Sequence, residues 1–164
     1  MDPQIILTPT TEADLAYVCS LEVDTVNSCY IIPYSLERHR QVLSSKDEAH
    51  FLIRDSVDTA PLGFIILAGL ASDHLSLEIR RIVIEAKGKG YGRKCLRLLK
   101  SYCFQVLGYH RLWLDVFEDN KHALHLYKSE GFVEEGKIRD AVRINGRYKS
   151  LLLLSMLESE YSPS

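Results

Sequence analysis

The spacing of apolar residues at the start of the chain predicts one strand followed by two helices. A short apolar run at residues 5–7 predicts the opening strand. Thr10 or Thr11 then precedes apolar positions that recur every three to four residues, which is typical of a capped helix. A second helix is expected to begin after Ser35 and to end near Val42.

Three strands are predicted next. Apolar runs at residues 50–54 and 62–67, separated by a turn region that contains Asp, Ser, Thr and Pro, indicate a pair of antiparallel strands. The third strand, residues 75–84, alternates regularly up to Arg80 and Arg81 and is continuously apolar after them. Such an interruption is typical of a β-bulge, at which the backbone turns away from a neighbouring strand.

The second half of the chain switches from an alternating to a helical period and back. A glycine-rich segment at residues 87–93 is followed by apolar positions from Leu96 to Val106 at helical spacing. Residues 112–116 then alternate again as a strand. The predicted order is therefore strand, glycine loop, helix and strand.

A further helix and a hairpin are expected to close the fold. Asp119 and Asn120 can cap a helix that continues through Tyr127 and stops at Gly131. Asn145-Gly146 is a type I′ turn signal between two apolar runs, which predicts a β-hairpin. The whole pattern predicts a mixed α/β (α+β) fold with a largely antiparallel sheet.

Composition narrows the class of protein. The chain has 164 residues, of which 46% are hydrophobic and 26% charged, and its net charge is −2. We therefore expect one soluble domain over residues 1–158 and a short polar tail at residues 159–164. The near-neutral charge argues against binding to nucleic acid, which needs a basic face. No apolar run is long enough to cross a membrane and no secretory signal is visible, so a cytoplasmic protein is expected.

The cysteines predict no metal site and no disulfide framework. Cys19, Cys29, Cys95 and Cys103 form no CxxC pair and have no histidine at a spacing that suits zinc. We expect free buried thiols.

The glycine-rich segment holds the first candidate site. In Gly88-Lys89-Gly90-Tyr91-Gly92, a glycine at every second position lets the backbone approach a ligand and lets several N–H groups converge at the start of a helix. Lys87, Lys89 and Arg93 add positive charge, so a diphosphate suits the loop, and a tight glycine turn with exposed lysines is the alternative. The P-loop motif does not fit because Gly90 follows Lys89, and the dinucleotide-binding motif does not fit because the glycines are spaced GxGxG.

Two blocks in the second half of the sequence occur in a recognisable order. The first is Lys87-Gly88-Lys89-Gly90-Tyr91-Gly92. The second comprises Arg111-Leu112-Trp113-Leu114-Asp115-Val116, Asn120, Ala123, Tyr127 and Gly131-Phe132. Together they resemble the GNAT superfamily of acetyl-CoA-dependent N-acetyltransferases, although Lys87 stands where the family usually has Gln or Arg. The terminal hairpin is similar to that of the ribosomal-protein and polyamine acetyltransferase branch.

The resemblance implies a GNAT-like fold whose central sheet is splayed at the bulge and flanked by helices. Acetyl-CoA would bind in the opening, with its pantetheine arm and thioester carbonyl against Ile82-Val83-Ile84. A backbone N–H near Val83 would polarise the carbonyl. The diphosphate would lie at Lys87 to Arg93, and Asn120 and Ala123 would add further cofactor contacts.

The implied activity is direct attack of a primary amine on the acetyl thioester in a ternary complex. A lysine-like amine has a pKa of about 10.4, so it must lose a proton before it attacks. Glu78 is the candidate base, directly or through water, or else it is a strand glutamate paired with Arg80 or Arg81. Tyr127 is the candidate acid, because the family uses a phenol at this position to protonate the departing thiolate.

Other functions stay open at the level of sequence. A non-catalytic acyl-CoA sensor or interaction domain would keep the fold without needing a catalytic acid or base, and an unrelated phosphate-binding domain would bind another nucleotide. For the enzyme, the acceptor is a small-molecule or peptide amine, with protein N-termini, polyamines, amino-acid analogues and aminoglycosides all open. A homodimer is common among similar proteins.

Two segments are expected to shape the acceptor pocket, residues 17–34 and residues 139–149. Both mix aromatic and charged side chains. Within the first segment, Glu22 and Asp24 either attract a cationic amine or lie in solvent.

Overall fold

Seven strands alternate with four helices along the described residues. The computed structural model describes residues 4–24, 27 and 29–163. The strands are β1 (Ile5–Pro9), β2 (Glu48–Asp55), β3 (Pro61–Ala68), β4 (Ser76–Ile84), β5 (Arg111–Phe117), β6 (Val133–Ile144) and β7 (Arg147–Leu157). The helices are α1 (Leu15–Val23), α2 (Leu36–Ser44), α3 (Tyr91–Ser101) and α4 (Lys121–Ser129). Short 3₁₀ turns, η1 (Glu12–Asp14) and η3 (Glu158–Glu160), and a π-helical turn, η2 (Tyr102–Val106), complete the described elements.

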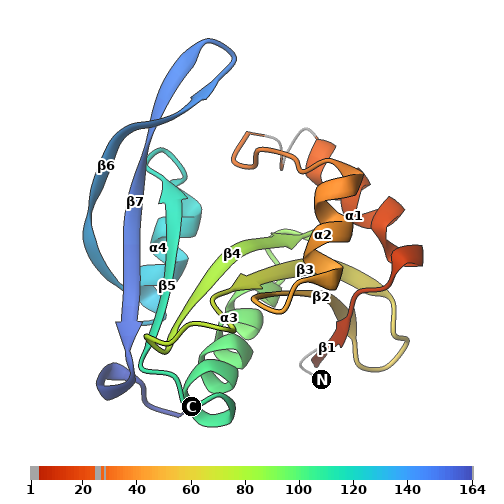
Figure 1. The fold of residues 1–164 in the computed structure, drawn as a ribbon, viewed down its shortest axis with the longest axis horizontal. Coiled ribbons are helices and arrows are strands. Elements are labelled where there is room, and N and C mark those ends of the chain that lie inside the picture. Colours follow the sequence, from red (N-terminus) through yellow and green to blue (C-terminus); the bar gives the residue numbers. More distant parts are fainter. Residues whose placement is uncertain (1–3, 25–26, 28, 164) are drawn as a thin grey trace.

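The strands form one sheet in the order β1-β2-β3-β4-β5-β7-β6 (Figure 1). Neighbouring strands are antiparallel except β4 and β5, which are parallel. A parallel pair needs a crossover connection, and α3 with η2 supplies it. The predicted mixed fold with a mostly antiparallel sheet is confirmed.

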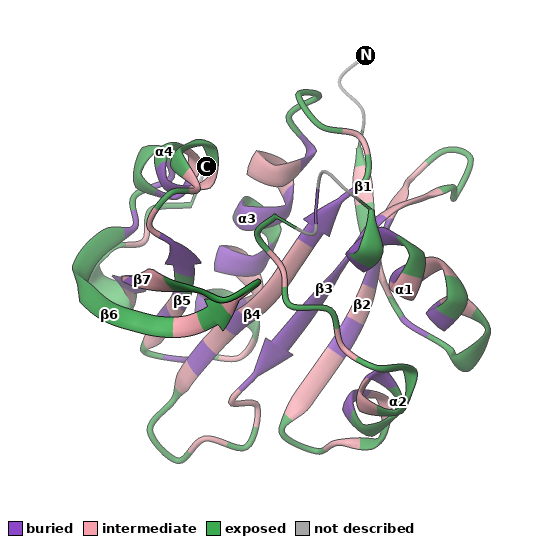
Figure 2. Cartoon of the chain, turned by 90° about the horizontal axis from the view of Figure 1, so that it is seen from above, coloured by how far each residue is buried: buried purple, intermediate pink, exposed green. Residues whose placement is uncertain are grey.

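The two faces of the sheet bury different residues, because successive side chains of a strand point to opposite sides. On β3, Ile65 and Leu67 belong to the core that includes α3 and α4, whereas Phe64 and Ile66 belong to the core that includes α1 and α2. All four side chains are fully buried. Figure 2 shows β3 buried along most of its length between the helices. The sheet is therefore the middle of three layers.

The predicted interruption of β4 is a β-bulge. In the ladder between β3 and β4, Ile66 pairs with Arg81 and Leu67 pairs with Ile79, so Arg80 is the extra residue. An extra residue on one strand bends that strand and increases its twist. The bulge therefore turns the second half of β4 away from the line of its first half.

The sheet opens on the other side of the same strand. β4 pairs with β5 at Ser76–Glu78, which lie opposite Arg111–Trp113, and the ladder ends there. Beyond this point the two strands diverge (Figure 1). The predicted splay is confirmed, and it leaves the edge of β4 from Ile79 to Ile84 without β5 as a partner.

The predicted helix starts are also observed. The Ser35 hydroxyl accepts a hydrogen bond from the N–H of Arg38 at 3.1 Å and caps α2. Thr11 precedes the 3₁₀ turn that leads into α1, and its N–H and hydroxyl donate to the Asp14 carboxylate at 2.8 and 2.9 Å. Both starts depend on contacts three residues apart, which the sequence pattern contains.

Two residues do not lie where their apolar character predicted. Val106 is 70% exposed. The reason is that α3 ends at Ser101 and the chain continues as a π-helical turn closed by a bond from Leu107 N–H to the Tyr102 carbonyl (2.9 Å), which changes the face that later residues present. Leu75 precedes β4 in a left-handed conformation (φ 52°) and is 45% exposed, so the strand begins one residue later than predicted.

The terminal hairpin forms at the predicted turn. Asn145 (φ 51°) and Gly146 (φ 78°) are both left-handed, as a type I′ turn requires. The first strand of the hairpin is longer than predicted and starts at Val133. After β7, the ring of Tyr161 packs against Phe104 with the ring centroids 5.1 Å apart.

The cysteine prediction is correct for two of the four positions. Cys95 and Cys103 are buried, and burial raises the pKa of both thiols to about 12. Cys19 is half-buried, and Cys29 is exposed because it lies in the connection between α1 and α2.

None of the helices in the described part of the chain has the length and apolar character that a membrane crossing requires.

Candidate active site

The opening beside β4 presents backbone groups to a ligand. Ile82-Val83-Ile84 lies in the part of β4 that β5 does not pair. Val83 packs into the core on the α1 and α2 side, and Ile82 and Ile84 pack on the α3 and α4 side. Because both cores hold these side chains, the free edge of the strand can receive an extended ligand as if it were a further strand.

The glycine loop has room beside its backbone. Gly88 and Gly90 have left-handed φ angles of 75° and 78°, and no described heavy atom lies within 4 Å of where a Cβ would stand at either position. The first backbone bond of α3 runs from Lys94 N–H to the Gly90 carbonyl at 3.2 Å. The N–H groups of residues 91–93 therefore have no intrahelical acceptor, and a helix start of this kind suits an anion such as a diphosphate.

Among the remaining loop residues, Gly92 allows close helix packing and the others carry positive charge. A Cβ at Gly92 would stand 3.2 Å from Leu126 Cδ2, so this glycine lets α3 approach α4 closely. The Arg93 guanidinium forms an ion pair with Glu130. The backbone N–H of Arg93 is one of those without an intrahelical acceptor, and Lys87 and Lys89 are exposed beside the loop.

The start of α4 is capped by a side chain of its own sequence. The Asn120 side chain accepts a hydrogen bond from the Ala123 N–H at 3.3 Å, so the predicted cap is confirmed. Ala123 is partly buried against the core. The cap leaves the amide nitrogen of Asn120 for other contacts.

Tyr127 lies about two turns further along α4 than Asn120. Its side chain is 9% exposed and its ring centroid is 6.1 Å from that of Phe132. Within the described residues its hydroxyl forms no hydrogen bond. Burial, together with the charge of Asp115, raises the pKa of Tyr127 to about 12. The phenol therefore keeps its proton at neutral pH, as a proton donor must.

Comparison with known proteins identifies this arrangement. The profile of the acetyltransferase (GNAT) family matches residues 17–132. The chain belongs to this family. A spermidine N(1)-acetyltransferase of Vibrio cholerae is 29% identical over 98% of this chain and 97% of its own, and one of Escherichia coli K12 is 26% identical over 94% of this chain and 87% of its own. The crystal structure of a Vibrio cholerae spermidine N-acetyltransferase in complex with CoA and spermine has a TM-score of 0.85 and 30% identity, and it covers 96% of this chain and 97% of that one.

The predicted enzyme class is therefore confirmed, since the chain is a GNAT-type acyltransferase that transfers an acetyl group to an amine. The acyl-CoA sensor is not favoured. Among the described residues, no group of three or more His, Cys, Asp or Glu side chains is arranged to hold a metal ion.

Glu78 of the acetyltransferase lies at the point where the sheet opens. It is the last residue of β4 that pairs with β5, opposite Trp113. Its carboxylate accepts hydrogen bonds from Arg80 Nη2 (2.9 Å) and Nε (3.2 Å), and Arg80 Nη1 also donates to Glu48 at 2.6 Å. The pairing with Arg80 that the sequence left open is observed, and the role of Glu78 as a base stays a prediction.

Asp115 of β5 is a carboxylate to which the sequence analysis gave no role. It is exposed, and no described residue forms a hydrogen bond or ion pair with it. Partial desolvation raises the pKa of its carboxyl, and Glu78 raises the pKa further whereas Arg80 lowers it. The sequence signal was a carboxylate in an otherwise aromatic alternation, between Trp113 and Phe117.

Glu22 is not available to an acceptor amine. Its side chain is 1% exposed, and its carboxylate binds His39 Nε2 and Arg81 Nη1. It also accepts a hydrogen bond from the Tyr34 N–H (3.3 Å), while Arg81 Nη2 donates to the Ile32 carbonyl (2.9 Å). Both expectations for Glu22, attraction of a cationic amine and exposure to solvent, are wrong, because its buried carboxylate binds Arg81 and connects the segment before α2 to β4.

The two segments that were expected to shape the acceptor pocket come together in space. Lys149 of β7 places its ammonium 3.5 Å from the Cys29 carbonyl and 3.2 Å from Asp119 Oδ2. The same ammonium lies 5.8 Å from the ring centroid of Tyr30 and 5.2 Å from that of Phe117. The hairpin and the α1–α2 connection therefore meet near the end of β5.

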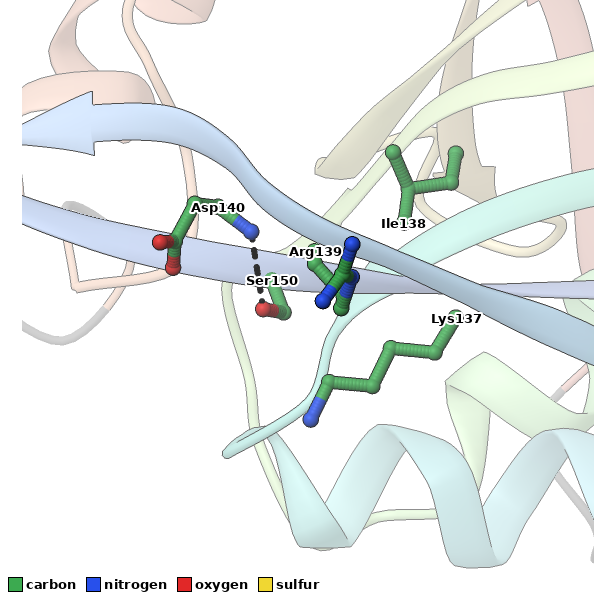
Figure 3. A pocket seen from close by; sticks show the side chains of 5 residues that line it. All are labelled: Lys137, Ile138, Arg139, Asp140 and Ser150. Atoms are coloured by element: carbon green, nitrogen blue, oxygen red, sulfur yellow. Dashed lines mark hydrogen bonds between the residues drawn. The ribbon is translucent and has the colours of Figure 1, made fainter.

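A shallow hollow on the hairpin belongs to a different part of the surface. It is lined by Lys137, Ile138, Arg139, Asp140 and Ser150 (Figure 3). It lies at the register shift of β6, where the Asp140 N–H donates to Ser150 Oγ at 3.0 Å. None of these residues belongs to the β4 edge, the glycine loop or the start of α4, so the hollow is not part of the candidate active site.

Proposed function

We propose that this acetyltransferase transfers the acetyl group of acetyl-CoA to a primary amine of a polyamine of the spermidine or spermine class. The observation that supports the proposal is the likeness, over nearly the whole of both chains, to the spermidine N-acetyltransferase in complex with CoA and spermine. The opened sheet and the glycine loop supply the geometry for the acetyl donor.

The chain offers two kinds of contact to acetyl-CoA. The unpaired edge at Ile82-Val83-Ile84 suits the pantetheine arm, and an N–H of this edge would polarise the thioester carbonyl. The N–H groups at the start of α3, with the exposed Lys87 and Lys89, suit the diphosphate. Acetyl-CoA supplies the acetyl group as an activated thioester.

Aromatic rings near the end of β5 suit a cationic acceptor. The Lys149 ammonium lies within 6 Å of the rings of Tyr30 and Phe117, the range at which a cation is attracted to an aromatic face. A primary ammonium of a polyamine has the same chemistry as the lysine side chain. A polyamine ammonium could therefore bind between these rings only in place of the Lys149 ammonium, because the two like charges repel each other.

The reaction needs two proton transfers, and two side chains are candidates for them. Tyr127, protonated at neutral pH, would donate its proton to the departing thiolate of CoA. Glu78 is a candidate to take the proton of the attacking ammonium, directly or through water, at the mouth of the opening.

The test is release of free thiol from acetyl-CoA in the presence of a panel of amines. Spermidine and spermine are compared with an aminoglycoside, free amino acids and a peptide with a free N-terminus. We expect turnover with the polyamines at a much higher kcat/KM than with the other amines. Turnover with the peptide but not with the polyamines would instead identify a protein N-terminus as the acceptor.

A further inference from the structure

The connection from α1 to α2 contains a strap, residues 29–34, that has no regular secondary structure and extends toward the end of β5 (Figure 1). On one side, the Lys149 ammonium of β7 lies 3.5 Å from the Cys29 carbonyl. On the other side, Arg81 Nη2 of β4 donates to the Ile32 carbonyl at 2.9 Å. Because β7 pairs with β5, and β4 and β5 border the opening, the strap is held by a cation on each side of the opening.

The strap lies on the face of the sheet opposite the glycine loop. Ile31 and Tyr34 of the strap pack against the core that includes α1 and α2. The glycine loop continues into α3, whose buried residues belong to the other core. Since acetyl-CoA is proposed to contact the glycine loop, the acceptor approaches the thioester from the side of the strap. The position of the strap therefore determines the space that the acceptor can occupy.

Arg81 contacts the strap in three ways. Its guanidinium donates to the Ile32 carbonyl. The guanidinium carbon also lies 4.1 Å from the ring centroid of Tyr34, within the range of a cation–π attraction. Finally, Arg81 pairs with the Glu22 carboxylate, which is 1% exposed and accepts a hydrogen bond from the Tyr34 N–H at 3.3 Å. A single side chain of β4 thus fixes both the backbone and a ring of the strap.

Two histidines hold the carboxylate that Arg81 binds. His39 Nε2 contacts Glu22, and His50 Nε2 lies 3.2 Å from His39 Nδ1. The Thr10 hydroxyl lies 2.8 Å from His50 Nδ1. Burial and the neighbouring His39 lower the pKa of His50 to about 4, so this ring is neutral at pH 7. A neutral ring can accept at Nδ1 and donate at Nε2, so all the hydrogen bonds of this row can point toward Glu22 and keep its carboxylate in one orientation.

We propose that Arg81 is a positioning residue for the acceptor, which sets the affinity for the polyamine by holding the strap beside the opening. This inference rests on the acetyl transfer to a polyamine proposed above. Tyr30 and Ile32 of the strap are 40% and 48% exposed, and apolar groups of this kind suit the methylene segments between the nitrogens of a polyamine. Arg81 acts on these groups through the strap, so its loss should change the binding of the amine and not that of acetyl-CoA.

The test measures kcat and the KM values for spermidine and acetyl-CoA by thiol release. Arg81→Lys keeps a positive charge beside Glu22 but loses the planar group that reaches both the Ile32 carbonyl and the Tyr34 ring. We expect the KM for spermidine to rise by about 10- to 100-fold, with the KM for acetyl-CoA unchanged. Tyr34→Leu removes the ring contact alone and should raise the same KM by a smaller factor.

Arg54→Lys is the matched control. Arg54 of β2 also binds a carboxylate and a backbone carbonyl of other segments, Asp14 at 3.4 Å and Thr59 at 3.0 Å, but it does not contact the strap. This variant should leave the KM for spermidine unchanged. Thermal stabilisation by CoA shows that each variant is folded.

A double variant separates position from stability. Arg81→Met leaves the buried Glu22 carboxylate without its guanidinium, and adding Glu22→Gln removes the unpaired charge as well. The double variant should therefore regain stability relative to Arg81→Met while the KM for spermidine stays high, because the strap still lacks its contacts to β4. A KM that recovers together with stability would show that Arg81 only stabilises the fold.

Hydrogen exchange gives a readout that does not depend on the acceptor. The Tyr34 amide is bound to Glu22, so the amides of the strap should exchange faster in Arg81→Lys than in the wild type, and not in Arg54→Lys. Unchanged exchange of the strap would overturn the proposal.

The remaining outcomes distinguish this proposal from the polyamine acceptor. An unchanged KM for spermidine in Arg81→Lys, or an equal rise in both KM values, would overturn the role of Arg81 and leave the polyamine activity intact. A wild type that acetylates a different amine refutes the polyamine acceptor, and the KM of Arg81→Lys for that amine then decides the role of Arg81. A wild type that releases no thiol with any amine refutes both proposals.

Discussion

Replacement of Glu130 by Gln should lower the free energy of unfolding by about 3 kcal/mol at pH 7. The Glu130 side chain is 4% exposed at the end of α4 and contacts three cations of α3, namely Arg93, Arg97 Nε at 3.2 Å and Lys100 Nζ at 3.0 Å. Burial opposes ionisation of this carboxyl, but the hydrogen bonds from Arg97, Lys100 and Arg93 outweigh it and lower the pKa from about 4.5 to about 2. Because a tenfold change in acidity corresponds to about 1.4 kcal/mol, the difference amounts to about 3 kcal/mol.

The sign of the pH dependence follows from a pKa that folding lowers. The stabilisation is complete above the ordinary pKa of about 4.5, and it is lost as the pH falls toward the folded value of about 2. We therefore expect the difference in the free energy of unfolding between the wild type and Glu130→Gln, measured with urea, to fall to about half near pH 3. Glu134→Gln is the control, because the Glu134–Lys128 pair (2.6 Å) is at the surface, and it should cost less than about 1 kcal/mol. A gap below about 1 kcal/mol at pH 7, or one that does not change with pH, would refute the reasoning.

Three further substitutions test the site and its support. Tyr127→Phe should lower kcat strongly and leave CoA affinity unchanged, and steady-state kinetics with an unchanged kcat would exclude the acid role. Gly90→Ala forces a side chain into a left-handed backbone (φ 78°) at a cost of about 1–2 kcal/mol and fills the space beside the loop, so thermal shifts should show weaker stabilisation by CoA than in the wild type. Arg81→Met removes the Arg81 cation from the buried Glu22 carboxylate and should lower the free energy of unfolding in urea by about 3–5 kcal/mol. The double variant with Glu22→Gln should lose less stability than Arg81→Met alone. A larger loss in the double variant would contradict the buried ion pair.

The sequence predicted those features that depend on neighbours along the chain. Ser35 and Asn120 cap their helices through the N–H three residues later, and Asn145-Gly146 forms a turn because both residues tolerate a left-handed backbone. The bulge at Arg80 was visible as a break in alternation. Together with the order of the two motif blocks, these local signals were sufficient for the fold class and the enzyme family.

What each charged group does was decided by the tertiary structure. Glu22 and Asp115 are both carboxylates within regular elements, and their local sequences do not show which of the two is buried. Glu22 is buried because His39 and Arg81, which are 17 and 59 residues away in sequence, bind it. Asp115 is open because β4 leaves the ladder beside it. The pKa and the accessibility of a side chain depend on the charges and the water around it in space, so sequence alone determined the framework, and the packing of distant segments determined which groups face the substrate.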